Sequence, residues 1–294
     1  MTPMDIEAVT QAAEWIADAD ALLITAGAGM SADPPLPDLR GAGRYWRTHP
    51  WLEQSGVEFG EIASPSTFRS DPRLAWGFYG RRLNLYRRTV PHEGYEILRR
   101  WADDKAYGAF VFTSNVDGQF QKAGFADDRV CEAHGSIHHL QCLDACGDHI
   151  WAGDGFEPVV DEGQCRLVSA LPGCRHCSSV ARPNVMMFSD YEWLSGRAET
   201  RLAKLGKWAS LVPRLVVIEI GAGTSIPTVR RFTEGFGARY VRINTTEPES
   251  PGRGIGLRGG GLQMLRLISN IIDRSGGSGG DRDRSAHDRT PVAV

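Results

Sequence analysis

Hydrophobic residues recur at helical spacing at the start of the chain and then give way to short apolar runs. Ile6, Val9, Ala13 and Ile16 follow the helix period, which predicts an amphipathic first helix. The apolar run at 21–25 suits a strand buried in a parallel sheet. Further runs of this kind occupy 109–112, 129–133, 215–218 and 240–243.

Helical patterns separate these runs and predict the layers of the fold. They cover 71–88, 92–102, 227–235 and 261–272. Strands that alternate with helices favour a parallel sheet covered on both faces. We therefore expect an α/β fold with a Rossmann-type doubly wound parallel sheet, together with a smaller zinc-binding module and a helical insertion.

Two stretches interrupt the alternation and set the expected domain organisation. Residues 41–90 are rich in aromatics and arginine and predict a helical module, whereas 138–182 hold five of the six cysteines. We expect one catalytic domain over 1–274, with its Rossmann core at about 1–40, 91–137 and 183–274. Residues 275–294 are nearly devoid of apolar side chains, which predicts a disordered tail.

Charge and hydropathy limit the kinds of partner that we expect the chain to bind. The formal net charge is −3, from 33 basic and 36 acidic residues, so no basic surface for nucleic acid is expected. No apolar run approaches the roughly 20 residues that span a bilayer, and the first residues lack the basic start of a secretory signal. We expect a cytoplasmic protein that binds no membrane; the sequence leaves the oligomeric state open.

A glycine-rich loop follows the first strand. Gly27, Ala28, Gly29 and Ser31 lie where a backbone could approach a pyrophosphate at a helix N-terminus. A tight strand-to-helix turn explains the same glycines without any ligand. Arg40 follows shortly and could contact a dinucleotide or form a surface ion pair.

Polar residues also follow two other predicted strands. Ser114, Asn115 and Asp117 come after the strand at 109–112, at the edge where parallel sheets bind ligands. A helix cap by Asn115 or Asp117 is the simpler explanation. His134 follows the strand at 129–133 and is the side chain best suited to take a proton near neutral pH.

Cysteine spacing predicts a metal site. Cys142 and Cys146 form one pair, and Cys174 and Cys177 form a second pair about one module away. Four thiolates at such spacing can close a tetrahedral zinc site, which would be structural because it leaves no open position. Cys165 and several histidines are alternative ligands.

These motifs together resemble a known family. In order, the sequence reads GAGMSA, PDLRG, TSNVDGQFQKAG, HGS, paired cysteines, ARPNVMMFSD, GAGTS and INTTEP. This series is similar to the sirtuins, the NAD-dependent protein lysine deacylases, over roughly residues 5–272.

The resemblance implies a mechanism and roles for the quoted residues. The acyl oxygen of a modified lysine on a protein substrate attacks C1′ of the nicotinamide ribose and releases nicotinamide. His134 then acts as general base on a ribose hydroxyl, and the acyl group moves to ADP-ribose. Asn115 and Asp117 hold the nicotinamide end of NAD. The remaining cofactor contacts come from Gly27, Ala28, Gly29, Ser31, Arg40, Ser114, Gly223, Thr224, Ser225 and Asn244.

Six residues, at four places in the chain, depart from the family pattern. Ser114 stands in place of a glutamine, Leu39 in place of a phenylalanine, and Pro34-Pro35 in place of a serine and a glycine. Ser189-Asp190 replaces a glycine–glutamate pair in the loop that lines the peptide groove.

One helix carries a signature of acyl specificity. Tyr79 and Arg82 resemble the pair found in the sirtuin subgroup that removes succinyl and malonyl groups. The planar arginine could bind a distal carboxylate with both nitrogens, and the tyrosine hydroxyl could add a hydrogen bond. An ion pair between Arg82 and a distant aspartate is the alternative.

Two other function classes share the same motifs. NAD hydrolysis or ADP-ribosyl transfer would use water or a protein side chain in place of the acyl oxygen. A non-catalytic NAD sensor would have no need of a base at His134.

Overall fold

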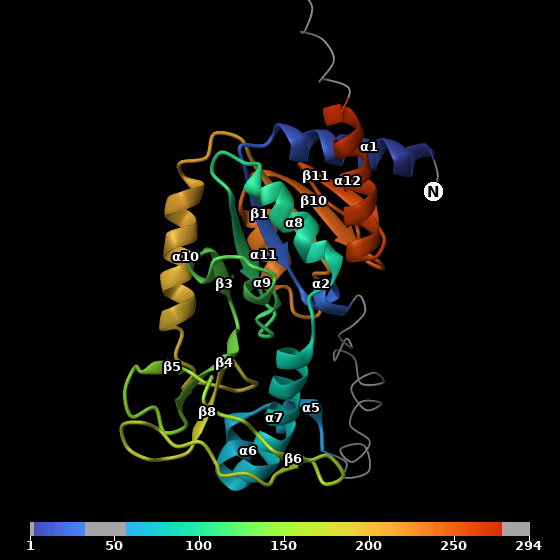
Figure 1. The fold of residues 1–294 in the computed structure, drawn as a ribbon. Helices are drawn as coiled ribbons and strands as arrows, with labels where there is room; N and C mark the ends of the chain where they lie inside the picture. Colours follow the sequence, from blue (N-terminus) through green and yellow to red (C-terminus); the bar gives the residue numbers. More distant parts are fainter. Residues whose placement is uncertain (1–2, 33–56, 278–294) are drawn as a thin grey trace, which may run out of the picture.

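The computed structural model describes residues 3–32 and 57–277, and Arg40, Leu39 and Pro34-Pro35 lie outside these ranges. The described chain forms a large upper body around one sheet and a smaller lower body (Figure 1). None of the helices in the described ranges combines the length and apolar composition needed to cross a bilayer.

The large body is built on a six-stranded parallel sheet. Its strands are β1 (Ala21–Ala26), β2 (Ala109–Thr113), β3 (Val130–Glu132), β9 (Leu215–Ile220), β10 (Arg239–Asn244) and β11 (Gly254–Arg258). Their order is β11-β10-β9-β1-β2-β3, and every neighbouring pair is parallel. The chain runs outward from β1 to β3 and then returns to the other side of β1 at β9, a reversal typical of doubly wound dinucleotide-binding folds. The predicted fold class is therefore confirmed.

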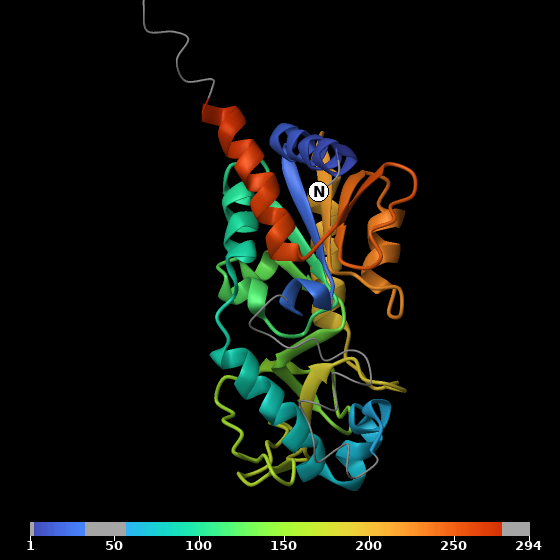
Figure 2. The same ribbon diagram turned by 90° about the vertical axis from the view of Figure 1, so that its right-hand side faces the viewer.

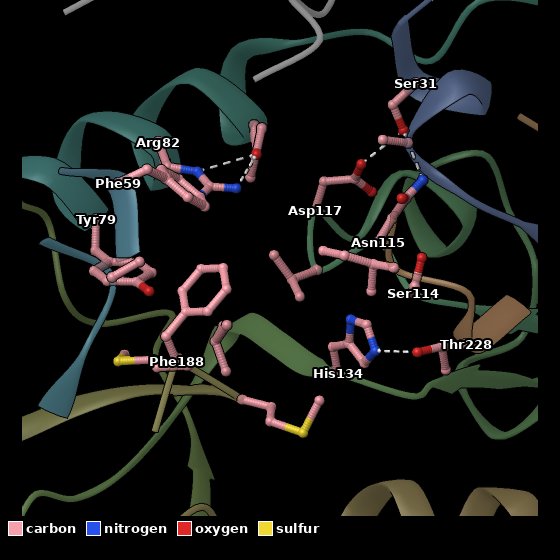
Figure 3. Close-up of a pocket in the computed structure, with 18 residues that line it drawn as sticks. Ser31, Phe59, Tyr79, Arg82, Ser114, Asn115, Asp117, His134, Phe188 and Thr228 are labelled. Carbon is pink, nitrogen blue, oxygen red and sulfur yellow. Dashed lines mark hydrogen bonds between the residues drawn. The ribbon is translucent and has the colours of Figure 1, made fainter. Parts of the chain in front are cut away.

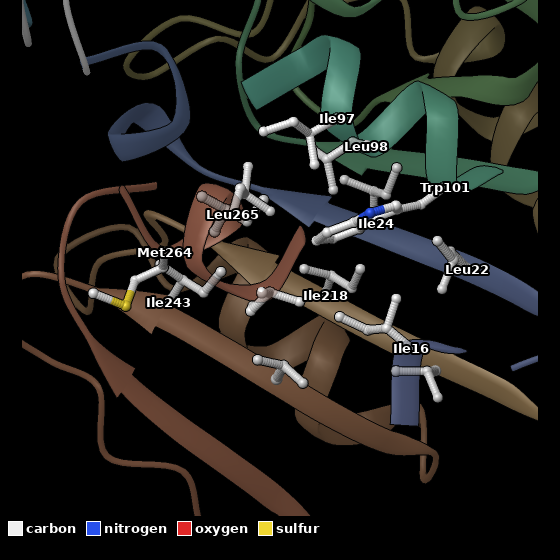
Figure 4. Close-up of a cluster of buried hydrophobic side chains, with 14 of the residues drawn as sticks. Ile16, Leu22, Ile24, Ile97, Leu98, Trp101, Ile218, Ile243, Met264 and Leu265 are labelled. Carbon is white, nitrogen blue, oxygen red and sulfur yellow. The ribbon is translucent and has the colours of Figure 1, made fainter. Parts of the chain in front are cut away.

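Helices cover both faces of this sheet (Figure 2). One face packs against α1 (Pro3–Asp18), α8 (Glu93–Asp103) and α12 (Gly261–Gly277), as Figure 4 shows for the apolar side chains between them. The other face packs against α10 (Gly196–Ala209) and α11 (Thr228–Gly235). Short helices α2 (Ala28–Ala32) and α9 (Gln119–Lys122) follow β1 and β2, and the 3-10 turn η1 (Asp127–Arg129) precedes β3.

The smaller body joins the two sequence insertions around one core. It contains α5 (Phe59–Ile62), α6 (Pro65–Ser70), α7 (Pro72–Arg88), β4 (Gly135–Cys142), β5 (Ile150–Ala152), β6 (Val160–Asp161), β7 (Arg166–Leu167) and β8 (Ala181–Val185). Phe78 and Leu83 of α7 share a buried cluster with Leu140 of β4 and Leu167 of β7. The helical segment and the cysteine-rich segment are thus one packing unit.

Several expectations about burial and elements need correction. Ile6 is 51% exposed, although Val9, Ala13 and Ile16 are buried as predicted. On α7, which matches the helical pattern predicted at 71–88, Leu74 and Leu85 are only partly buried. The buried positions there include Ala75, Trp76, Phe78, Tyr79, Leu83 and Tyr86. The hydrophobic pattern missed β11 and α10.

Candidate active site

The carboxyl ends of neighbouring parallel strands bring the predicted site residues to one edge of the sheet. Along this edge, Asn244 ends β10, the turn at 221–225 follows β9, and the glycine loop follows β1. Ser114, Asn115 and Asp117 follow β2, and His134 comes two residues after β3 ends. The edge therefore presents them in one continuous row.

The first glycine loop packs tightly on the turn after β9. A Cβ atom on Gly27 would lie 2.5 Å from the Gly221 carbonyl oxygen, and one on Gly29 would lie 2.5 Å from the Gly221 Cα. Gly29 N–H also donates to the Gly221 carbonyl at 3.0 Å. The close packing of the two turns is thus sufficient to require these glycines, whether or not the loop binds a ligand.

Ser31 is the centre of a buried hydrogen-bond network (Figure 3). Its hydroxyl donates to Asp117 Oδ2 at 2.7 Å and accepts from Asn115 Nδ2 at 3.1 Å. The Tyr95 hydroxyl lies 3.0 Å from Ser31 Oγ. Because Ser31 has a single proton and gives it to Asp117, Tyr95 is the donor in that contact. The network fixes the orientation of the Asn115 and Asp117 side chains.

Asp117 is a buried carboxyl with both oxygens engaged. Its Oδ1 accepts from the Gln119 N–H at 3.0 Å and its Oδ2 accepts from Ser31, whereas the N-cap position of α9 is Gly118, so Asp117 is not the helix cap. Burial raises the pKa of Asp117, and the hydrogen bonds from Gln119 and Ser31 and the charges of His138 and Arg82 oppose that shift. Asp117 is therefore set to hold or accept a proton more readily than an exposed aspartate.

His134 lines the same cavity from the end of the neighbouring strand β3. Its Nε2 lies 3.0 Å from Thr228 Oγ1, at the first turn of α11 (Figure 3). Its carbonyl oxygen accepts from the Met186 N–H at 2.9 Å. The backbone and the ring of His134 are thus both held in place.

Arg82 comes into the cavity from α7 together with Tyr79. Its Nε and Nη2 donate to the Tyr86 hydroxyl at 3.2 and 2.8 Å. Its guanidinium carbon lies 6.0 Å from the centre of the Tyr79 ring. Burial raises the pKa of Tyr79 to about 12 despite the positive charge of Arg82, so this hydroxyl stays protonated and can donate.

Side chains from both bodies line one cavity of about 340 Å³. Ala28, Ser31, Ser114, Asn115, Asp117 and His134 contribute from the sheet edge, and Tyr79 and Arg82 contribute from α7. An apolar wall completes the cavity, with side chains from Phe59, Ala63, Val116, Val185, Met186, Met187, Phe188 and Ile226. A cavity of this kind can hold a charged head group and an apolar chain at once.

The predicted adenosine side lies further along the edge, outside this cavity. Gly223, Thr224 and Ser225 form the turn after β9, where Thr224 and Ser225 are exposed. Thr224 donates to Glu247 from its N–H at 3.0 Å and from its hydroxyl at 2.7 Å. Asn244 Nδ2 donates to the Ala222 carbonyl at 2.9 Å, so Asn244 also braces this turn.

The four predicted cysteine ligands come together in the smaller body. The sulfur atoms of Cys142, Cys146, Cys174 and Cys177 all lie within 4.8 Å of one another. Two of the pairs, Cys142 with Cys177 and Cys146 with Cys174, are 3.6 Å apart. Zinc–sulfur bonds of about 2.3 Å in a tetrahedron separate the sulfurs by about 3.8 Å. The donor set therefore fits a zinc ion, and Cys165 lies outside the cluster.

Comparison with known proteins assigns the chain to a family. The model of the Sir2 family matches residues 27–211, which is more than half of the chain. The chain belongs to the Sir2 family. The match includes the glycine loop, His134 and all four clustered cysteines.

Individual relatives of this Sir2-family chain differ in how much of their length it covers. It is 30% identical over 267 residues to "NAD-dependent protein deacylase 2" of Pyrobaculum aerophilum, covering 89% of this chain and 95% of that protein. It is 31% identical over 238 residues to a "Probable bifunctional ADP-ribose hydrolase/ADP-ribosyltransferase" of Fusarium oxysporum f. sp. cubense. That match covers 75% of this chain but only 38% of the longer fungal protein.

Solved structures share the fold of this Sir2-family chain. The crystal structure of a complex between a Sir2 homologue and NAD superposes with a TM-score of 0.63 at 22% identity, covering 90% of this chain and 94% of that one. Similarity at this level of identity bears on the fold alone.

Sequence analysis of the Sir2 motifs missed several residues at the site. Tyr86 could have been found, because it lies one helical turn after Arg82. Tyr95 and Thr228 reach the site from elements that are distant in sequence, and nothing in their local pattern marks them. Glu247 lies within the INTTEP motif, where the sequence analysis gave it no role.

Proposed function

We propose that this chain is an NAD-dependent protein lysine deacylase. The observation that carries the proposal is the single cavity between the two bodies. It joins the Ser31–Asn115–Asp117 network, the candidate base His134 and the Tyr79–Arg82 pair. Such a cavity suits the nicotinamide ribose and the acyl-lysine side by side, which is the juxtaposition that acyl transfer to ADP-ribose requires. Family membership and the printed name of the Pyrobaculum relative support it.

The chemistry proposed here is the one that the family resemblance implies, and these positions are compatible with it. The acyl oxygen attacks C1′ of the nicotinamide ribose, and nicotinamide leaves with the bonding electron pair. His134 takes a proton from a ribose hydroxyl, whose oxygen then attacks the acyl carbon. Water completes the transfer, so acyl-lysine, NAD and water give lysine, nicotinamide and O-acyl-ADP-ribose. Asn115 and Asp117, oriented by Ser31, hold the nicotinamide end.

The rest of the dinucleotide would follow the sheet edge. Gly27, Ala28 and Gly29 would face the phosphates, with Arg40 and Ser114 as further contacts. Gly223, Thr224, Ser225 and Asn244 would hold the adenosine half, and this would require Thr224 or Glu247 to exchange their mutual hydrogen bonds for contacts with the ligand. These assignments remain predictions.

The acyl group would be one that ends in a carboxylate, such as succinyl or malonyl. Arg82 supplies the positive charge in the cavity, and Tyr79 supplies a hydroxyl that stays protonated. A charge-assisted, two-nitrogen contact to a carboxylate is stronger than a contact to a neutral acetyl group. The protein substrate itself would bind along the apolar wall around Met186 and Phe188.

Zinc would be structural in this enzyme. The four thiolates of Cys142, Cys146, Cys174 and Cys177 would hold one ion and stabilise the segment between β4 and β8. This site belongs to the smaller body and contributes no residue to the cavity. A cytoplasmic location remains a prediction.

NAD hydrolysis or ADP-ribosyl transfer is the second candidate, and the name of the Fusarium relative includes ADP-ribosyltransferase. One experiment separates the two. We would incubate the protein with NAD and matched acetyl-, malonyl- and succinyl-lysine peptides and identify the products by mass spectrometry. O-Acyl-ADP-ribose formed together with free lysine supports deacylation. Free ADP-ribose or ADP-ribosylated protein, with intact acyl-lysine, would support the second candidate.

A further inference from the structure

Thr228 touches the candidate base from an element that the motif analysis gave no catalytic role. Its Oγ1 lies 3.0 Å from His134 Nε2, and both side chains line the cavity (Figure 3). The two residues are far apart in sequence, since His134 follows β3 and Thr228 begins α11.

The His134 ring benefits from such a partner. The torsion that turns an imidazole about its bond to Cβ is broad and roughly two-fold, so sterics alone set the ring angle poorly. The backbone of His134 is already fixed by the Met186 N–H and by the close approach of Gly135 to the Asn184 carbonyl. The ring angle is a separate degree of freedom, which a directional hydrogen bond restricts.

A hydroxyl group suits both protonation states of a general base. It can accept from Nε2–H of the neutral imidazole, which leaves Nδ1 unprotonated and able to take the ribose proton, and it can accept from the same N–H of the imidazolium. The contact therefore persists while His134 takes up and releases a proton. A β-branched threonine also has few accessible rotamers, so its hydroxyl is held in a defined direction.

The helix that carries Thr228 is itself firmly docked. Phe232 stacks on Phe112 of β2 with ring centres 3.7 Å apart and an interplanar angle of 9°. Thr233 Oγ1 lies 2.8 Å from Thr25 Oγ1 of β1, where both residues are buried. Arg230 Nε donates to the Ala222 carbonyl at 3.0 Å. These three contacts join α11 to the sheet and fix its first residue beside His134.

We propose that Thr228 is a positioning residue for His134, which sets the orientation of the imidazole for proton transfer during deacylation. The proposal rests on the proposed function. It assigns the role to the hydroxyl group of Thr228 and not to its methyl group. It also requires that Thr228 act through His134 alone.

Two substitutions of Thr228 distinguish the role of its hydroxyl group from that of its methyl group. Thr228→Val keeps the shape and removes the hydroxyl, and we expect kcat to fall about tenfold with KM for NAD nearly unchanged. Thr228→Ser keeps the hydroxyl, and we expect its kcat within about threefold of the wild type. Equal losses in both variants, or a wild-type kcat in Thr228→Val, would overturn the proposal.

A double-mutant cycle tests whether Thr228 affects turnover through His134. In a His134→Ala background, Thr228→Val should change the residual turnover by less than about twofold, because its only target is gone. The same tenfold loss in that background would show that Thr228 acts elsewhere.

Thr233→Val is the matched control on the same helix. It removes a hydroxyl that docks α11 but lies outside the cavity. We expect a lower melting temperature and a kcat within about twofold of the wild type. A tenfold loss of kcat there would attribute the Thr228 effect to helix docking.

The wild-type assay distinguishes the two levels of the hypothesis. If the wild type forms no O-acyl-ADP-ribose, the proposed function fails. If it does and Thr228→Val is as active, only the positioning role fails.

Discussion

Arg82 is the residue whose substitution best tests acyl specificity. Its side chain lines the cavity, and its Nε and Nη2 are oriented by the Tyr86 hydroxyl. Arg82→Met keeps much of the apolar stem and removes the charge. A charge-assisted bond contributes about 1.5–3 kcal/mol, so we expect kcat/KM for succinyl-lysine peptide to fall roughly ten- to a hundredfold. Acetyl-lysine turnover should be equal or higher, measured on peptides that differ only in the acyl group.

The neighbouring Arg81 supplies the control for this variant. It lies on the same helix but does not line the cavity, so Arg81→Met should leave the ratio of succinyl to acetyl turnover unchanged. Equal loss of both substrates in Arg82→Met would mean that Arg82 only supports the fold. A wild-type preference for acetyl-lysine peptide would contradict the proposed specificity for acyl groups that end in a carboxylate.

Glu132 predicts a pH dependence of stability. It is 1% exposed and its Oε2 accepts from Arg197 Nη1 at 2.6 Å. Burial nevertheless raises its pKa from 4.5 to about 7, with Arg197 lowering it and Asp117 adding to the rise. The folded protein thus keeps a proton that the unfolded chain releases, and ionisation of Glu132 costs stability as the pH rises through this window.

Glu132→Gln should remove this cost. Relative to the wild type, its free energy of unfolding should rise between pH 4.5 and pH 7, by about 3 kcal/mol at most. Urea unfolding at several pH values measures the difference. Glu14→Gln, on the exposed face of α1, is the control and should show no such trend. A constant difference for Glu132→Gln across this range would contradict the prediction.

Residues at strand ends could be predicted from the sequence, whereas their partners could not. Asn115, Asp117 and His134 each follow an apolar run, and parallel strands present their carboxyl ends at one edge. The partners Tyr95 and Thr228 belong to α8 and α11, whose rotation about their own axes depends on packing against the sheet. A local pattern carries no information on that rotation.

At the scale of elements, the cysteine cluster predicts one zinc ion per chain. Elemental analysis of protein purified without chelator should give close to one equivalent. Cys174→Ser should lower both the zinc content and the melting temperature, because the β4–β8 segment loses its cross-link. Cys165→Ser, outside the cluster, should keep the metal. A metal-free protein with an unchanged melting temperature would show the zinc assignment to be wrong.

The close packing of the turn after β1 on the turn after β9 gives a second prediction at the scale of elements. Gly29→Ala would place a Cβ atom 2.5 Å from the Gly221 Cα, where only backbone movement could relieve the clash. We expect a loss of about 1–3 kcal/mol in the free energy of unfolding. Gly206→Ala, in exposed α10 with no atom within 4 Å of its added Cβ, should instead stabilise the protein by about 0.5–1 kcal/mol. Chemical denaturation of both variants measures the contrast, and a neutral Gly29→Ala would contradict it.

The elements that sequence analysis missed have weak patterns for physical reasons. In β11, Gly254 and Gly256 make room for the Tyr240 ring and the Pro248 carbonyl, so the strand carries few of the apolar residues that signal burial. In α10, only Leu205 and Trp208 are buried, and the rest of the helix is mostly polar. The longer runs of β1, β9 and β10 are buried on both faces and were therefore predicted.

At the scale of the whole molecule, the described chain holds two sets of buried side chains with the cavity between them. The clusters on the two faces of the parallel sheet join it to its covering helices, and a separate cluster unites α7 with β4, β7 and β8. The sequence predicted the helical and cysteine-rich segments as two insertions. It could not predict their shared core, because residues 91–137 separate them along the chain and only tertiary packing brings them together.

The shared core has a consequence for how preparations of this protein behave. The helix that carries Arg82 shares a core with the strands on either side of the cysteine cluster, so we expect loss of the metal to disturb the position of Arg82. Two batches with equal affinity for NAD could then rank succinyl and acetyl peptides differently. We therefore expect the measured acyl specificity of a sample to depend on its metal content.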